Sequence, residues 1–586
     1  MRKKVGCFSI RSWLAVAIVL SGLLVLRNSA AAQASKSANL SGLASVSGMV
    51  ESAKPFQAAK VYVRNAEKRM LYMVYTNGGR YQAMHLFPGN YELSVQAKGL
   101  ESDVQKLVLK AGQTATANVS LREASAAEQR RDVEILPFDE IYPPGPGLAV
   151  ARKTCLYCHG ANFIPARHLD AKAWNAAIDY MTGKDNRQGA MIQPNEMNQS
   201  EREVLVQYLV QNFGPNSKTR AVKVETEMPV DETKLAKAMY VEYYFPPDPP
   251  GSGIHDPKYA GITDEGPFAG RRVSQDVHFD QQGNVWIIDR GFPNRLCKLD
   301  PRTGQFKEYL TPDPTAGVHD LTIDKNGIVW VPENEGVPAG QLKLDGFNPK
   351  TEKWEARYPF DPENVIPAST VKHAQSLTID SKGNIYTVLI LGSGLSRWDR
   401  ETKKMTTYPM PSPNAFPYGI VVDKNDNIWI AEFHASKIAK FDPKTEKFTE
   451  YSPPTQPALI RRLNVDSKGN IWFGLFSAGK LDKLNPATGK ITEYKIPHQV
   501  SQPYDVAESG DKLWIADAGQ GGALIQFDPQ AETFTYFPTP QRSDMPKLKI
   551  TREGAVWYPP RSSQKFPGAG VLYPDMTKIT TLGAYF

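Results

Sequence analysis

One aromatic position recurs at a nearly constant interval through the C-terminal part of this chain of 586 residues. The spacings between successive copies are 44, 56, 43, 43, 42 and 43 residues, and the copies are Trp286, Trp330, Tyr386, Trp429, Trp472, Trp514 and Trp557. The sequence around these aromatic residues repeats as well, as a comparison of residues 423–454 with residues 466–497 shows. A unit of this length cannot bury its apolar face alone, so such units stack on one another around one continuous core.

Each unit is expected to contain four short strands, because short alternating segments are separated by turn residues. In the unit around Trp429 these strands are predicted over 419–423, 428–432, 437–442 and 448–451. Four strands every ~40–45 residues form one propeller blade. The repeat therefore predicts a seven-bladed β-propeller over residues 239–586, with extra loop residues in the second and third blades.

Residues 239–247, MYVEYYFPP, resemble the fourth strand of a unit but precede the first complete unit. We expect this segment either to pair into the last blade and close the ring, or to add an outer strand beside residues 579–586. Closure matters because an open ring leaves a strand edge without hydrogen-bond partners.

The first 34 residues read as a secretory signal peptide, with a basic start, a short apolar run and small residues before the cleavage site. Their removal takes away five positive charges and no acid, so the formal net charge falls from +7 to +2. We therefore expect a periplasmic or secreted protein with no transmembrane segment in the mature chain and no affinity for nucleic acid. Of the cysteines that remain, Cys297 is expected to be a buried small hydrophobe.

Residues 40–122 alternate in the manner of strands, with turns at Asn77-Gly78-Gly79 and at Pro88-Gly89. The motifs "GMV", "GRY" and "LFPGNY" in this segment resemble the carboxypeptidase regulatory-like family. That resemblance implies a seven-stranded β-sandwich that serves as a folding or binding accessory. Polar, Pro-rich or Gly-rich linkers are expected over 123–147 and 217–238.

Residues 148–216 have helical periodicity, including a Ser200-x-x-Glu203 capping box before an apolar stripe. The same segment contains TCLYCHG, in which Cys155 and Cys158 are followed directly by His159. This spacing predicts covalent attachment of one haem c, with His159 as axial iron ligand. A zinc site would need two further ligands, and a redox CxxC would need a thioredoxin-like context.

The segment is similar to small one-haem cytochrome c domains that are fused to redox partners, which implies a small all-α domain. The resemblance implies Met181 as the sixth iron ligand, because it follows the Trp-containing helix. Met191 is the second candidate, since the loop after Met181 is lengthened here. A methionine ligand raises the reduction potential and suits electron transfer.

The start of the first strand and the end of the second strand of each blade are expected to meet at one end of the blade near the propeller axis. The first position is occupied by Gln275, His319, Gln375, Tyr418, Arg461, Tyr504 and Lys547. The second is occupied by Asp289, Glu333, Leu389, Glu432, Leu475, Asp517 and Pro560. His319, Glu333 and Glu432 are the candidate catalytic residues, and a polar, water-filled channel lining is the alternative.

The blade motif resembles the streptogramin B (virginiamycin B) lyase family. The resemblance implies β-elimination with a histidine base and Mg²⁺, and its histidine and carboxylate correspond to His319 and Glu333. The family's second histidine is Gln275 here, and an acidic residue two positions before the first histidine is Gly317. These departures weigh against both elimination and Mg²⁺ binding.

The chain is thus expected to be mainly β and multidomain, with a β-sandwich, a cytochrome c domain and a propeller. The favoured function is haem-mediated electron transfer coupled to a substrate or partner at the propeller axis, with a redox protein or a small-molecule donor as partner. The alternatives are a virginiamycin B lyase-like carbon–oxygen lyase or hydrolase, and a non-catalytic binding module.

Overall fold

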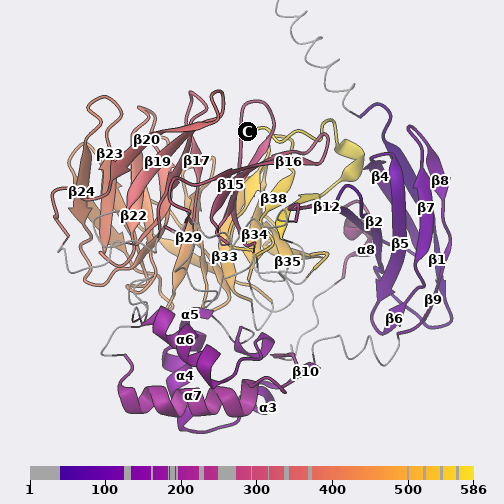
Figure 1. Ribbon diagram of the computed structural model, residues 1–586, viewed down its shortest axis with the longest axis horizontal. Coiled ribbons are helices and arrows are strands. Elements are labelled where there is room, and N and C mark those ends of the chain that lie inside the picture. The colour runs from indigo at the N-terminus through magenta and orange to yellow at the C-terminus, as the bar shows by residue number, and fades with distance from the viewer. Residues whose placement is uncertain are drawn as a thin grey trace, which may run out of the picture.

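The computed structural model of the chain shows an N-terminal β domain, a helical unit and a propeller (Figure 1). The residues it describes are 40–124, 134–159, 161, 163–182, 184, 192, 196–222, 230–247, 272–291, 293–314, 316–334, 342–366, 373–497, 501–518, 523–541, 545–561 and 567–586. The predicted signal peptide and Met191 lie outside these residues. Within the described ranges no helix has the length and apolar character needed to cross a lipid bilayer.

Six antiparallel sheets of four strands each form most of the propeller, each in the order of the sequence. The first three are β13(Ser274–Phe279), β14(Val285–Asp289), β15(Arg295–Asp300), β16(Gln305–Leu310); β17(Thr322–Ile323), β18(Val329–Pro332), β19(Lys343–Asn348), β20(Lys353–Pro359); and β21(Ala374–Ile379), β22(Ile385–Leu389), β23(Gly394–Trp398), β24(Met405–Pro409). The next three are β25(Pro417–Val422), β26(Ile428–Glu432), β27(Lys437–Asp442), β28(Lys447–Tyr451); β29(Ile460–Val465), β30(Ile471–Leu475), β31(Lys480–Leu484), β32(Ile491–Lys495); and β33(Pro503–Ser509), β34(Lys512–Asp517), β35(Ala523–Asp528), β36(Thr533–Pro538).

A single aspartate fixes the turn between the first two strands of a blade. In the fourth sheet, Oδ1 of Asp423 accepts the backbone N–H groups of Asn425 and Asn427, while Oδ2 accepts the indole N–H of Trp429 at 2.9 Å. The same indole–aspartate bond is made by Trp286 with Asp280, Trp330 with Asp324, and Trp472 with Asp466. The bond satisfies a buried indole donor and locks the hairpin to the blade core, which explains why the motif recurs.

The seventh unit is not a separate sheet. Its strands β37(Lys549–Ile550), β38(Val556–Tyr558) and β39(Gly568–Tyr573) continue into β12(Met239–Tyr244) and from there into the N-terminal domain, within one sheet of thirteen strands. The prediction of seven separate blades is therefore corrected to six. The physical reason is that β12 is hydrogen bonded along both edges, to β39 on one side and to β3(Met70–Tyr75) on the other, and all six of its residues are buried.

The N-terminal domain contains nine strands, two more than the predicted sandwich. Besides β3, these are β1(Ala44–Ser52), β2(Lys60–Asn65), β4(Arg80–Leu86), β5(Gly89–Ala97), β6(Leu100–Glu101), β7(Gln105–Leu109), β8(Thr114–Thr116) and β9(Val119–Glu123). The predicted turn at Gly78 and Gly79 is present, and both glycines have positive φ (53° and 79°). A Cβ on Gly79 would lie 2.7 Å from the carbonyl oxygen of Val50, so this turn needs glycine on steric grounds too.

Residues 134–222 form a helical unit with an apolar core of its own, to which Leu148, Ile178 and Leu205 contribute. Its helices are α3(Phe138–Ile141), α4(Pro146–Lys153), α5(Cys155–His159), the 3₁₀ turn η1(Ile164–Ala166), α6(Ala171–Met181) and α7(Gln199–Phe213). A parallel pair of short strands, β10(Glu134–Leu136) and β11(Arg220–Val222), closes the unit. Both strands lie in the segments expected to be linkers, 123–147 and 217–238, so these two linker predictions are corrected. The unit lies below the propeller in Figure 1, with α5 and α6 nearest to it. Two short elements, α8(Glu232–Leu235) and η3(Met576–Lys578), lie outside it.

Candidate functional site

Six side chains, one from each of the six repeat units between residues 274 and 538, are linked by hydrogen bonds and ring contacts, and we call them the axial cluster: Gln275, His319, Gln375, Tyr418, Arg461 and Tyr504. The amide nitrogens of Gln275 and Gln375 lie 3.1 Å and 2.8 Å from Nε2 of His319. The hydroxyls of Tyr418 and Tyr504 are hydrogen bonded to each other, and Arg461 donates to the Tyr504 hydroxyl at 3.4 Å. Six of the seven residues that the repeat placed at the start of the first strand are thus brought together.

Both ring nitrogens of His319 are occupied. Nδ1 lies 2.8 Å from Oδ1 of Asp320, a carboxylate that can only accept, so the proton is assigned to Nδ1 and Nε2 accepts from the glutamine amides. Burial lowers the pKa of His319 well below its usual value, and Asp320 offsets this only in part. His319 is therefore a neutral, fixed imidazole at the centre of the cluster.

The seventh predicted residue, Lys547, belongs to an ion network next to the cluster. Its ammonium donates to Asp276 at 2.7 Å and to Asp320 at 2.8 Å. Arg462 donates to both carboxylate oxygens of Asp320, at 3.0 Å and 3.1 Å. Burial alone would raise the pKa of Asp320, but Arg462 and Lys547 lower it well below its usual value. Sequence reasoning missed Asp320 and Arg462, although each directly follows a residue that it singled out.

Arg461 is held in place by four aromatic rings. Its guanidinium carbon lies 4.4 Å from the ring centre of Phe476, 4.7 Å from Phe433, 4.8 Å from Tyr504 and 5.2 Å from Tyr418. Cation–π attraction from several rings at this range fixes a guanidinium that is only half-buried. Arg461 is thus a positive charge at a defined position on the axial face.

The predicted pairing of His319 with Glu333 is not found, since no hydrogen bond or ion pair joins them among the described residues. Glu333 instead faces the outer strands of its own blade, where it is bonded to the guanidinium of Arg357 and to the backbone N–H of Lys343 at 2.9 Å. Burial and the nearby Asp345 raise the pKa of Glu333 to about 7. Its carboxylate therefore stabilises the interior of the second blade and is not directed at the axial cluster.

Glu432 lies in the equivalent place in the fourth sheet and is fully buried. Burial and the neighbouring Glu450 raise its pKa to about 8. Glu450 itself is bonded to Lys437 at 2.7 Å, and its pKa is lowered despite its burial by hydrogen bonds from Lys437 and Ser412. The three predicted catalytic residues therefore occupy three separate environments.

The CxxCH motif forms helix α5. Cys155 is half-buried against the core of the helical unit, with its sulfur 3.5 Å from the hydroxyl of Thr154. The ring of His159 stacks on that of Phe163, with ring centres 3.9 Å apart. The guanidinium carbon of Arg167 lies 4.1 Å from the centre of the Phe163 ring. Met181, the last residue of α6, packs against the same core. The structure thus places the predicted ligands His159 and Met181 around one apolar cluster.

Charges of the propeller act on His159 of the helical unit. Burial, together with the guanidinium groups of Arg461, Arg167 and Arg561, lowers the pKa of this imidazole to about 3. Arg561 also donates to Gln275 of the axial cluster at 3.2 Å. Two propeller arginines therefore lie close enough to His159 to act on its charge.

Two family models match parts of the chain. Residues 364–567 match the virginiamycin B lyase family, and residues 45–122 match the carboxypeptidase regulatory-like domain. No curated protein matches the chain. The described helical unit, residues 134–222, lies outside both matched ranges.

Several solved structures are similar to the propeller. A streptogramin B lyase is 21% identical over 52% of this chain and 94% of that chain, with a TM-score of 0.45. A catalytically inactive virginiamycin B lyase from Staphylococcus aureus with quinupristin is 21% identical over 52% of this chain and 95% of that chain, also with a TM-score of 0.45. The extracellular domain of a hybrid two-component system from B. thetaiotaomicron is 16% identical over 52% of this chain and 40% of that chain, with a TM-score of 0.41. From the two family matches, the chain carries a virginiamycin B lyase-like propeller domain and a carboxypeptidase regulatory-like domain.

Proposed function

We propose that this chain is an exported, haem c-containing electron-transfer protein whose haem lies between the helical unit and the axial face of the propeller. Cys155 and Cys158 would hold the haem covalently, His159 would be one iron ligand, and Met181 the other, with Met191 as second candidate. When bound, the haem accepts and releases one electron at a time. The signal peptide and the need for c-type haem assembly outside the cytoplasm support a periplasmic or secreted location.

The residues present fit a haem. His159 is neutral, and no hydrogen bond to either of its ring nitrogens is recorded among the described residues. The surrounding groups are apolar, which suits the porphyrin faces. The buried indole N–H of Trp174 has no partner within the described part of the chain, so an acceptor is missing from its surroundings. A haem supplies acceptor oxygens through its propionates.

The observation that carries the proposal is that Arg461 and Arg561 of the propeller both lower the pKa of His159 in the helical unit. A haem brings two propionates, and guanidinium groups are the preferred partners of carboxylates. Arg167, Arg461 and Arg561 supply that positive charge from both units. The propeller would then be a wall of the redox site, and a donor docked on its axial face would lie near the haem.

The strands β37, β38, β39 and β12, as part of the thirteen-stranded sheet, are proposed to close the ring. They have the antiparallel order of the six separate blades. They also lie between the sixth and first sheets, because β37 contacts β33 while β38 and β39 contact β13. A ring closed in this way would carry the N-terminal β domain as a rigid extension of its last blade, since β12 pairs with β3.

A carbon–oxygen lyase is the second candidate, supported by the match of residues 364–567 to the virginiamycin B lyase family. Elimination needs a histidine free to take a proton, whereas Nε2 of His319 is bonded to two glutamine amides. Glu333 is bonded to Arg357 and is therefore not free to hold Mg²⁺. Incubation of the purified protein with virginiamycin B and Mg²⁺, with the linear product followed by mass spectrometry, tests this function.

The test of the haem proposal is expression of the full chain together with c-type maturation machinery. We expect the mature protein to gain the mass of one haem, and Cys155→Ala with Cys158→Ala to lose it, while Cys297→Ala keeps it. A wild-type protein that matures without a haem would overturn the proposal. Reduction of the ferric haem by a panel of small donors then identifies the electron source.

A further inference from the structure

A second candidate site lies where the indole–aspartate bond of the blades is missing. Four blade tryptophans donate their N–H to a turn aspartate. Trp514 and Trp557 have no such bond within the described residues. The position of the turn aspartate, at the end of the first strand, is occupied by Ser509 in the sixth sheet, where Ser509 pairs with Lys512. In the last group of strands it is occupied by Thr551. A hydroxyl thus replaces the carboxylate twice, in neighbouring units.

Thr551 shows why the indole is left without an acceptor. Its hydroxyl accepts the backbone N–H of Ala555 at 3.1 Å, as Oδ1 of Asp280 accepts that of Asn284. An aspartate has a second oxygen for the indole, and threonine has none. The turn is therefore preserved, whereas the indole N–H of Trp557 has no acceptor in the part of the chain that the structure describes.

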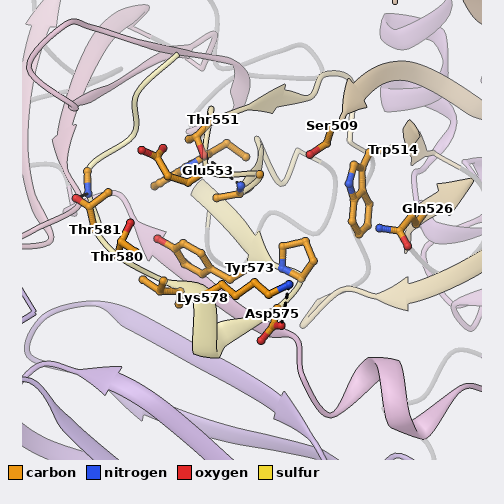
Figure 2. A pocket seen from close by; sticks show the side chains of 16 residues that line it. Ser509, Trp514, Gln526, Thr551, Glu553, Tyr573, Asp575, Lys578, Thr580 and Thr581 are labelled. Atoms are coloured by element: carbon orange, nitrogen blue, oxygen red, sulfur yellow. Dashed lines mark hydrogen bonds and ion pairs between the residues drawn. The ribbon is translucent and has the colours of Figure 1, made fainter. Parts of the chain in front are cut away.

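Both tryptophans line the same cavity of about 210 Å³. In Figure 2 the nitrogen-bearing edge of Trp514 is turned toward the middle of this cavity, facing the side chains of Thr551, Glu553 and Tyr573. The chain end that borders the cavity lies on the opposite side of the propeller from the helical unit (Figure 1). The cavity is thus separate from the axial cluster.

The lining favours a neutral, hydroxyl-rich ligand. The residues that line the cavity supply both donors and acceptors, including the Gln526 amide and the hydroxyls of Ser509, Thr580 and Thr581. The two carboxylates of the lining are each paired with a cation, Glu553 with Arg552 at 2.7 Å and Asp575 with Lys578 at 3.6 Å, so the lining favours neither an anion nor a cation. The volume is below the roughly 300–1,000 Å³ of sites for drug-sized ligands, which limits the occupant to one small ring.

We propose that this cavity binds one sugar unit, whose hydroxyl oxygens accept the N–H groups of Trp514 and Trp557 in place of the missing aspartates. A pyranose offers hydroxyls that both donate and accept, together with C–H faces that pack against aromatic walls such as Tyr573. Binding involves no covalent change. It leaves the haem motif untouched, so this site and the proposed redox function succeed or fail independently.

The test titrates the full-length protein with glucose, galactose, mannose and N-acetylglucosamine, each followed by saturation-transfer NMR and tryptophan fluorescence. At least one sugar is expected to bind saturably. Trp514→Phe, which keeps an aromatic ring but removes the N–H together with the five-membered ring of the indole, should weaken that binding at least tenfold. The matched control Trp429→Phe, whose N–H is already bonded to Asp423, should change it less than twofold.

Thr551→Asp is the second variant, because it restores the acceptor and fills the cavity. We expect it to weaken sugar binding at least tenfold and to raise the melting temperature. If no sugar binds the wild type saturably, or if Thr551→Asp and Trp514→Phe bind like the wild type, the cavity holds only water and the proposal is wrong. Melting temperatures of all variants show whether each is folded.

Discussion

The guanidinium of Arg461 lowers the pKa of the imidazole of His159, although the two residues belong to different units and are separated in sequence by the first half of the propeller. Four aromatic rings surround Arg461 and hold it in place. A fixed positive charge of the propeller therefore acts on the residue that the CxxCH motif marks as an iron ligand.

Replacing Arg461 by glutamine is expected to lower the reduction potential of the bound haem. A nearby positive charge favours the ferrous over the ferric state, because the ferrous state carries one positive charge less. At the dielectric of a protein surface the loss is on the order of tens of millivolts. Potentiometric titration of the haem spectrum measures it. Lys307→Gln, which changes an exposed lysine paired with Glu352, is the control and should leave the potential unchanged. An unaltered potential in Arg461→Gln would show that the haem does not face the propeller.

The sixth ligand can be identified by comparing Met181→Ala with Met191→Ala. Loss of a thioether ligand removes the sulfur-to-iron charge-transfer band at the red end of the spectrum and lowers the potential. We expect both changes in Met181→Ala only, because Met181 packs on the same apolar cluster as the haem motif. If only Met191→Ala shows them, the ligand is in the loop.

Lys547 is expected to be a stability determinant. Lys547→Met leaves the buried carboxylates of Asp276 and Asp320 with one cation fewer, and breaking a buried ion pair costs about 3–5 kcal/mol. The control Lys512→Met removes solvent-screened pairs with Asp511 and Asp528 and should cost much less than Lys547→Met. Chemical denaturation of both variants measures the difference. Equal losses would mean that the network contributes no more than a surface pair.

Stability should fall as the pH rises from about 4.5 to about 8, because Glu432 has its pKa raised to about 8 in the folded chain. In that window the folded state holds a proton that the unfolded state has released, so unfolding becomes easier with each step upward in pH. Glu432→Gln cannot ionise and should remove this contribution, on the order of 2–4 kcal/mol at pH 9. Thermal melts between pH 5 and 9 test it, with Glu446→Gln on the surface as control. A Glu432→Gln profile parallel to the wild type would contradict it.

The repeat alone predicted the axial cluster, because a fixed period brings equivalent first-strand residues to one axis whatever their chemistry. It could not predict where the second-strand carboxylates point, since Glu333 finds its partner Arg357 two strands away. The sequence also could not predict that the last blade strands and the N-terminal domain share one sheet. The pairing of β12 with β3 joins segments over 160 residues apart, and neither segment carries a local sequence signal for it. The start of α7 was misplaced for a smaller reason. Asn198 and Glu201 form the capping box two residues before the predicted Ser200 and Glu203, and both pairs satisfy the motif.

His319 and Glu333 are expected to give different phenotypes, because the structure separates them. His319→Ala removes the acceptor of Gln275 and Gln375 and the donor to Asp320, so the axial cluster loses its centre. If a donor is oxidised at this cluster, the rate of haem reduction by that donor should fall at least tenfold. Glu333→Gln alters the bonds to Arg357 and to the backbone N–H of Lys343, both inside the second blade, so it should shift the melting temperature and leave that rate within twofold. Stopped-flow reduction of the ferric haem and thermal melts, run on both variants, separate the two effects. Equal rate losses in both variants would restore the pair as one site, and unchanged rates in both would reduce the axial cluster to a structural lining.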